Sequence, residues 1–278
     1  MASRDLSLTT RIFLSTAAVV AAVLGVTLFF TSRQAERTAD STVNRALAQA
    51  SDQIATQLDA RRRALQGSAD IFAKDPNFRS LVQSKTKLGD LLDQVIEAHE
   101  RIGADWVQVT DATGTLLAKS DDPGAEPHDL SGSALISGAL AGKLSAGYGK
   151  DPKGLLQTIA VPVTVQAGAA ERVVGALMAV RSIDTAFAQS VKSASPDSID
   201  VAFFALDSAG PRVVASTVGA GAEVTGAITS LTWSADPAIA DSAAPMRAMA
   251  QMGGVEYVTL GAPLRSASGS LVGGMVVF

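Results

Sequence analysis

One pattern of residues occurs twice in the sequence, and this repeat limits the chain to folds with two similar modules. Residues 105–114 read Asp-Trp-Val-Gln-Val-Thr-Asp-Ala-Thr-Gly, and residues 200–210 read Asp-Val-Ala-Phe-Phe-Ala-Leu-Asp-Ser-Ala-Gly. Both copies place apolar residues before an Asp-x-x-Gly turn signal and further apolar residues after it. Each copy therefore predicts a strand, a tight turn and a second strand.

The closing part of each copy repeats as well, since residues 159–163 and 172–178 resemble residues 260–264 and 270–276. The closing strands are predicted at residues 155–165, 172–180, 256–264 and 270–278. The middle differs between the copies. The first has a Pro-, Gly- and Asp-rich loop (121–133) and a helical stretch (134–144), and the second has a polar loop plus short helix (236–252). This order is typical of an α+β fold in which two antiparallel sheets carry helices on one side.

A long helix is predicted before the first copy. Residues 33–73 hold no proline and only one glycine, and their apolar residues recur at steps of three, four and seven. The resulting stripe suits either packing against the first module or the seam of a dimer, and both can hold on different faces. Asp75-Pro76 then predicts the start of a second helix, and Gly103 the end of an amphipathic third one. Residues 182–195 predict a connecting helix that ends at a Ser-Pro pair.

Residues 12–30 contain no charge and predict a transmembrane helix, because about 20 apolar residues cross a hydrocarbon core of about 30 Å. A cleaved signal peptide is the alternative. Its apolar region is usually shorter and ends in small residues, whereas this one ends Leu-Phe-Phe-Thr-Ser-Arg. Basic residues flank both ends, so the positive-inside rule does not decide the orientation. The chain has no cysteine, which favours an extracytoplasmic location.

The composition argues against several classes of function. The net charge is -4 with mixed signs throughout, so nucleic acid is not an expected partner. Without cysteine there are no disulfides, thiolate metal sites or cysteine nucleophiles. We interpret His99 as a half-buried core residue and His128 as part of a solvated acidic loop, so no metal site and no cofactor are expected. Hydrolase signatures are missing, and catalysis by this chain is not expected.

A membrane anchor, a long helix and two such modules in series resemble the double Cache (dCache) class of bacterial extracytoplasmic sensors, whose modules are PAS-like. The resemblance rests on residues 12–30, the helix from Arg33, the two Asp-x-x-Gly hairpins, and the closing strands around Pro162 and Pro263. It implies a cytoplasmic N-terminus (1–11), a transmembrane helix (12–30), stalk and packing helices (31–103), a membrane-distal Cache module (104–181), a connecting helix (182–198) and a membrane-proximal Cache module (199–278).

The resemblance implies that the distal module holds the ligand, and a pocket is expected between its sheet and the variable loop-helix segment. The candidate ligand-binding residues are polar or aromatic side chains on or beside the predicted strands: Trp106, Gln108, Lys119, Tyr148, Lys150 and Gln157. Trp106 and Gln108 share a strand face, whereas Tyr148 and Lys150 flank a glycine-rich turn. Core packing of Trp106 and solvation of the lysines are the competing interpretation. The amino-acid-binding motif of the family, arginine followed by Trp-Tyr, does not occur, so free amino acids are not favoured.

The sequence therefore predicts the non-enzymatic, ligand-sensing ectodomain of a membrane-bound signal-transduction receptor: a histidine kinase, nucleotide cyclase, diguanylate cyclase or chemoreceptor. We expect it in the inner membrane with residues 31–278 extracytoplasmic, as a homodimer through its stalk. A small molecule of unknown class would act by shifting a conformational equilibrium. The resemblance also implies a second span and an output domain after Phe278. The alternative is a surface module that binds a partner protein and no small molecule.

Overall fold

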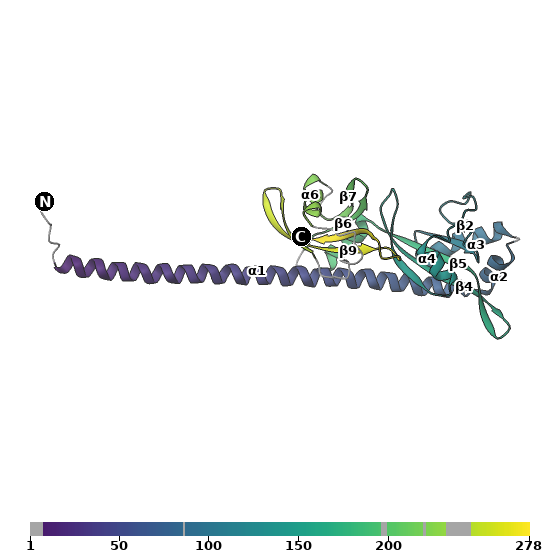
Figure 1. Cartoon of the computed structure of the whole chain (residues 1–278), viewed down its shortest axis with the longest axis horizontal. Helices are drawn as coiled ribbons and strands as arrows, with labels where there is room; N and C mark the ends of the chain where they lie inside the picture. Colours follow the sequence, from purple (N-terminus) through teal and green to yellow (C-terminus); the bar gives the residue numbers. More distant parts are fainter. Residues whose placement is uncertain (1–7, 86, 196–198, 219–220, 232–245) are drawn as a thin grey trace. The chain divides into compact units, whose positions relative to one another are not determined.

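The computed structural model describes residues 8–85, 87–195, 199–218, 221–231 and 246–278 (Figure 1). The chain divides into two compact units, residues 1–46 and residues 47–278. Helix α1 (Leu8–Ala73) begins in the first unit. All other helices and strands that the structure describes belong to the second unit, which is mixed α+β.

The first unit contains the predicted membrane span. Few side chains before Thr42 are described, and three of these, Val23, Leu24 and Phe29, are 57–59% exposed. The predicted span at residues 12–30 therefore falls mostly on side chains outside the described part. Within the described part of the chain, no helix is both long and apolar enough to cross a membrane.

In the second unit, the apolar stripe of α1 is buried against both modules. Leu47, Ala50, Ile54 and Leu58 belong to one core cluster, and Leu65, Ala69 and Phe72 belong to another. The first set packs with strands of the second sequence copy, and the second set packs with strands of the first. The packing role predicted for the stripe is thus confirmed and extends to both modules. The dimer seam remains a prediction.

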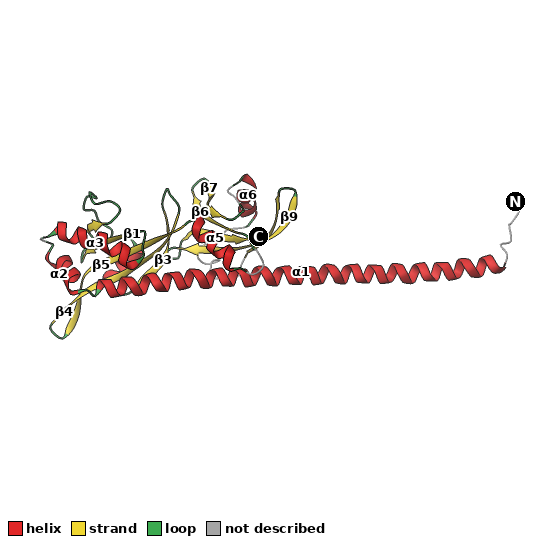
Figure 2. Ribbon diagram, turned by 180° about the vertical axis from the view of Figure 1, so that it is seen from behind, coloured by secondary structure: helices red, strands yellow, loops and turns green. Residues whose placement is uncertain are grey.

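Two five-stranded antiparallel sheets have the same strand order, which confirms the tandem repeat at the level of topology. Figure 2 shows strands of both modules in yellow. The first sheet, order β2-β1-β5-β4-β3, contains β1 (Trp106–Asp111), β2 (Leu116–Lys119), β3 (Ser145–Lys150), β4 (Leu155–Ala167) and β5 (Ala170–Ile183). The second, order β7-β6-β10-β9-β8, contains β6 (Val201–Asp207), β7 (Gly210–Ser216), β8 (Met246–Met252), β9 (Val255–Arg265) and β10 (Leu271–Val277). We call these sheets with their helices the first and second modules.

The predicted helix boundaries follow from capping. Asp75 Oδ1 accepts hydrogen bonds from the backbone N–H groups of Asn77 (2.9 Å) and Phe78 (3.0 Å), and α2 (Pro76–Ser84) begins directly after it. Helix α3 (Leu88–Ile102) ends at Gly103, whose φ of 72° is the left-handed conformation that glycine adopts readily. Both predicted boundaries are confirmed.

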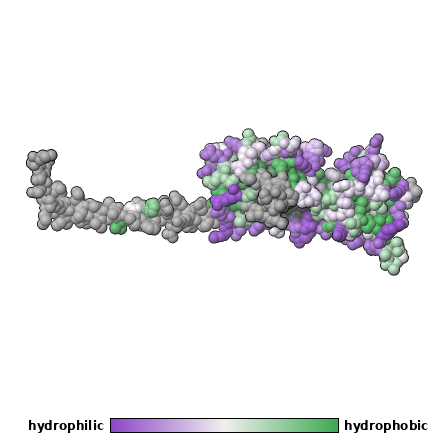
Figure 3. Space-filling model, in the orientation of Figure 1, coloured by the Kyte–Doolittle hydropathy of each residue, from purple (hydrophilic) through white to green (hydrophobic). Residues whose placement is uncertain are grey.

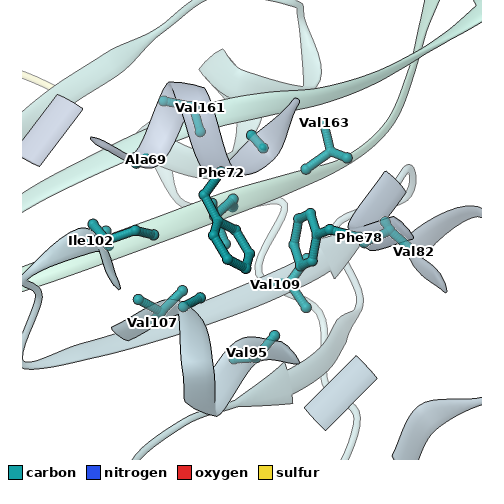
Figure 4. Close-up of a cluster of buried hydrophobic side chains, with 14 of the residues drawn as sticks. Ala69, Phe72, Phe78, Val82, Val95, Ile102, Val107, Val109, Val161 and Val163 are labelled. Atoms are coloured by element: carbon teal, nitrogen blue, oxygen red, sulfur yellow. The ribbon is translucent and has the colours of Figure 1, made fainter. Parts of the chain in front are cut away.

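Each sheet is covered on both faces, so the prediction of helices on one side only is wrong: apolar residues of the second face of each sheet also pack under a helix. The end of α1 packs with α2 and α3 on one face of the first sheet, around an edge-to-face pair of Phe72 and Phe78 with ring centroids 5.0 Å apart (Figure 4). We call this the α1 face. Helix α4 (Ala134–Leu140) covers the opposite face, the α4 face. On the second sheet, α5 (Thr185–Ala194) and α1 share one face, and α6 (Ala222–Ser230) covers the other.

Three predicted local structures need correction. The glycine-rich turn that Tyr148 and Lys150 were predicted to flank is instead part of the edge strand β3. Residues 246–252, assigned to a polar loop and short helix, form β8, and the helix of this module lies earlier, at α6. Residues 236–245 of that prediction lie outside the described residues. The short helix predicted at 134–144 ends at Leu140.

Hydrophilic side chains spread over much of the visible surface of both modules (Figure 3).

Candidate functional site

The six predicted ligand-binding residues lie on opposite faces of the first sheet. Gln108 lies opposite Lys119 on β2 and opposite Met178 on β5, which packs against the α4 cluster. Trp106 lies two residues before Gln108 on β1, so the two side chains share the α4 face. Lys119 lies on the same face, because it is the cross-strand partner of Gln108. Tyr148 lies opposite Gln157, whose Nε2 donates to the Leu58 carbonyl of α1. The structure therefore brings together two groups of residues, one on each face.

Polar side chains lie buried beneath α4. The Gln108 side chain is directed at the Met178 sulfur, with Nε2 3.4 Å from Sδ, and Gln108 is only 7% exposed. The neighbouring Thr110 is fully buried, and its Oγ1 has no hydrogen-bond partner among the described residues. An unpaired buried hydroxyl costs stability.

Trp106 lies beside a cavity of about 400 Å³.

 The cavity lies at the end of the sheet that faces the second module, and Trp106 is half-buried in its wall. The Lys119 ammonium lies 4.6 Å from the centre of the Trp106 ring and 3.2 Å from Asp121 Oδ1. A cation on the face of an indole ring is held by the ring's quadrupole. Trp106, Lys119 and Asp121 thus form one cluster at the cavity; we call this cavity the Trp106 cavity.

Four carboxylates line the Trp106 cavity, contributed by Asp105, Asp121, Asp151 and Asp184. Three of them accept hydrogen bonds from backbone N–H groups. Asp105 Oδ2 accepts from the Ser182 N–H (2.6 Å), Asp151 Oδ1 from the N–H groups of the following turn, and Asp184 Oδ1 from the first turn of α5. Among the described residues, no group of three or more His, Asp or Glu side chains is arranged to hold a metal ion. The carboxylates instead give the cavity wall a negative charge.

A second cavity, of about 530 Å³, lies on the α1 face where α1, the first module and the second module meet. Tyr148 and Gln157 line it, together with residues of α1, β9 and β10. Burial raises the pKa of the Tyr148 hydroxyl, and the neighbouring Gln157 amide and Arg62 guanidinium act in the opposite direction. We call this the junction cavity.

Lys150, the remaining predicted residue, links the two modules. Its Nζ donates to the Leu206 carbonyl and lies 3.3 Å from Asp207 Oδ1, at the end of β6. Arg212 Nε lies 2.8 Å from the other oxygen of the same carboxylate. The hydrogen bonds from Arg212 and Lys150 lower the pKa of Asp207.

Sequence reasoning missed one half-buried charge, Arg61. Its Nη2 donates to the Ser182 carbonyl (2.8 Å), and its guanidinium carbon lies 4.6 Å from the centre of the Phe187 ring. Burial lowers the pKa of Arg61 to about 10, and repulsion from Arg181 acts in the same direction. The residue therefore stays charged at neutral pH. The signal for it was present in the sequence, where three consecutive arginines interrupt the apolar stripe of the stalk helix.

Comparisons with known proteins agree with this architecture. The sequence matches the dCache_3 family, described as a double sensory domain of two-component sensor kinase, over residues 40–278. No curated protein matches the sequence significantly.

Among solved structures, the chain is similar to the sensor domain of the Vibrio cholerae histidine kinase DctB, with a TM-score of 0.51 and 13% identity over 84% of this chain and 94% of that one. It also matches the sensory domain of the Campylobacter jejuni chemoreceptor Tlp3 (TM-score 0.48, 14% identity, 86% and 93% covered). A further match is the ligand-binding domain of the Pseudomonas fluorescens chemoreceptor CtaA in complex with L-alanine (0.45, 14%, 86% and 95%). The first likeness shows a shared fold, and the family match covers most of the sequence. The chain therefore belongs to the double Cache family of sensory domains.

Proposed function

We propose that this chain is the extracytoplasmic ligand-sensing region of a membrane-bound signalling receptor, anchored by residues 12–30 and dimeric through α1. Membership of a sensory-domain family supports the receptor role. The apolar, uncharged run at residues 12–30 supports the anchor. In this arrangement the first module is membrane-distal and receives the ligand, and the second module passes the response toward the membrane and a cytoplasmic output.

The Trp106 cavity is the proposed binding site, and its lining carries the assignment. A volume of about 400 Å³ suits a small metabolite. The lining contains the aromatic face of Trp106 and four carboxylates, and its lysine is Lys153. This excess of negative charge favours a positively charged ligand. We therefore propose a small amine. Its ammonium group would compete with Lys119 for the Trp106 ring and for Asp121, which are already arranged around a cation.

Signalling follows from where this cavity lies. Its wall includes Val214 of the second module and Asp184 and Thr185 at the start of α5. A ligand that touches both modules favours the arrangement in which these groups are close together. The population shift is limited by the difference in affinity between the two arrangements.

Thermal unfolding of the full chain with putrescine, agmatine and choline tests the proposal, with butanediol as a neutral analogue of putrescine. A ligand at 100 times its dissociation constant adds roughly 2.7 kcal/mol, or about 5 to 10 °C in melting temperature for a protein of this size. We expect a shift with at least one amine and none with butanediol.

Two substitutions with a matched control locate the site. Trp106→Leu and Asp121→Asn should abolish the amine-dependent shift. Asp122→Asn should retain it, because Asp122 is exposed and does not line the Trp106 cavity. If no amine stabilises the chain, the charge assignment is wrong. If organic acids, sugars and purines also leave the melting temperature unchanged, a surface module that binds a partner protein becomes the better explanation.

A further inference from the structure

The junction cavity is built from three separate parts of the second unit. Helix α1 contributes Leu58 and Arg62, the edge of the first sheet contributes Tyr148 and Gln157, and β9 and β10 contribute the remaining wall. That remaining wall consists of Ala262, Pro263, Leu264, Arg265 and Met275. At about 530 Å³ the cavity lies within the usual range of small-molecule sites.

Gln157 supplies an unused hydrogen-bond acceptor at this cavity. Its side chain is 1% exposed, and its Nε2 donates to the Leu58 carbonyl at 2.8 Å. That bond fixes the orientation of the amide, because only the nitrogen can donate. The Oε1 atom is then left buried without a hydrogen-bond partner among the described residues. A buried acceptor without a partner costs about 1–3 kcal/mol, which a ligand that donates a hydrogen bond would recover.

Apart from the Tyr148 hydroxyl, which lies beside the Gln157 amide, the rest of the wall is mainly apolar, and its charges are already paired or bonded. Arg62 lies 2.5 Å from Asp59, and Arg265 Nη1 donates to the Gly269 carbonyl at 2.9 Å. Leu58, Leu264 and Met275 are buried. The chemistry thus fits an apolar body with one hydrogen-bond donor, rather than an ion.

We propose that the junction cavity is a second ligand site, for a small, mainly apolar molecule whose hydroxyl group donates to Gln157 Oε1. A molecule there contacts α1 and both modules at once, so its binding depends on their arrangement. This site differs in lining and ligand chemistry from the Trp106 cavity, and the inference does not rest on the proposed function.

Methionine methyl NMR of the full chain, labelled with ¹³C at the methionine methyl groups, tests the inference directly. Met275 lines the junction cavity and reports binding there, whereas Met178 lies under α4. The probes are cyclohexanol and cyclohexanone, which are similar in size and shape, but only cyclohexanol donates a hydrogen bond. We expect cyclohexanol to shift the Met275 signal and to bind about fivefold more tightly than cyclohexanone, the value of one net hydrogen bond of about 1 kcal/mol.

Three variants distinguish the contribution of the Gln157 acceptor to binding from that of the cavity space. Gln157→Met removes the acceptor and should abolish the preference for cyclohexanol. Ala55→Phe places a ring in the wall from an exposed position of α1 and should abolish binding of both probes. Its matched control, Ala60→Phe, introduces the same ring at an exposed position of the same helix outside the cavity lining, and should bind as the wild type does.

Two results would overturn the inference: equal affinity for the two probes in the wild type, or an unchanged Met275 response in Ala55→Phe. The latter variant lies on the surface, so it answers the question even if Gln157→Met fails to fold. Trp106→Leu should leave the cyclohexanol response intact. A wild-type chain that shows no amine-dependent shift but keeps the Met275 response to cyclohexanol would therefore overturn the proposed function alone.

Discussion

At the scale of single residues, one carboxylate does most to define the first hairpin. Asp111 Oδ1 accepts from the backbone N–H groups of Thr113 (2.8 Å) and Thr115 (3.0 Å), while Oδ2 lies 2.6 Å from Lys85 Nζ. Burial alone would raise the pKa of Asp111, but these hydrogen bonds outweigh it and hold the pKa at about 2. The same residue thus closes the turn and ties β1 to the end of α2.

This pKa predicts a specific loss of stability in acid. Because the folded pKa is lower than the unfolded value of about 3.9, the ionised carboxylate contributes about 2 kcal/mol at neutral pH, and this is lost as the pH falls from about 5 toward 2. Urea unfolding across that range should show the loss in the wild type. In Asp111→Asn the stability should be lower at neutral pH and should fall less in acid. Asp122→Asn, at an exposed carboxylate, should follow the wild type. If the free energy of unfolding falls with pH equally in Asp111→Asn and the wild type, Asp111 does not contribute to the pH dependence of stability.

The two copies of the turn show how far sequence reasoning reaches at this scale. The Asp-x-x-Gly signal correctly predicts both hairpins, because the geometry is local: Gly114 and Gly210 have φ values of 90° and 115°. One partner of the second aspartate, Arg212, is local, but another is not. Asp207 pairs with Lys150, which belongs to the other module, and that pairing depends on how the modules pack.

At the scale of elements, the edge strand β3 explains why a strand was mistaken for a turn. Gly147 and Gly149 give it the composition of a turn. Gly147, however, is where the β9–β10 turn of the second module approaches. A Cβ built at Gly147 would lie 2.8 Å from the Ser266 carbonyl carbon and in collision with the Ala267 nitrogen. The glycine is needed for close backbone approach, a tertiary reason that composition does not reveal.

Gly147→Ala should therefore weaken the docking of the second module on β3. The added methyl group meets backbone atoms, which cannot rotate away, so we expect a loss of about 1–3 kcal/mol and faster hydrogen exchange in the β9–β10 turn. Gly149→Ala on the same strand is the control, because its Cβ would lie 3.5 Å from the nearest atom, Thr158 Cγ2, an ordinary contact. Equal effects of the two substitutions would mean that general strand propensity, and not docking, is responsible.

The candidate site was predictable only in part, for a related reason. Alternation correctly places Trp106 and Gln108 on one strand face, which is a property of a single strand. The positions of Tyr148 and Gln157 depend on the pairing of β3 with β4 and on α1, which covers them. The two groups consequently lie on opposite faces of the sheet, at two different cavities.

At the scale of the whole second unit, α1 connects the two modules through their cores. Leu65 is 2% exposed within the first module's core, and Leu58, two turns earlier, is 2% exposed within the second module's core. A helix shared between two cores should couple their stabilities, because loosening it exposes apolar surface in both.

Leu65→Ala tests this coupling with the methionine methyl signals as separate reporters. Met178 belongs to the first module and Met275 to the second. Truncating a buried leucine costs about 2–5 kcal/mol. If the shared helix makes unfolding cooperative, both signals should lose their native positions together and at the same lowered temperature. Ile71→Ala on the same helix is the control, since Ile71 is 74% exposed and its truncation should change stability by no more than about 0.5 kcal/mol. A lowered transition for Met178 alone would show that the modules unfold independently, and that α1 could not carry a response from one to the other by this route.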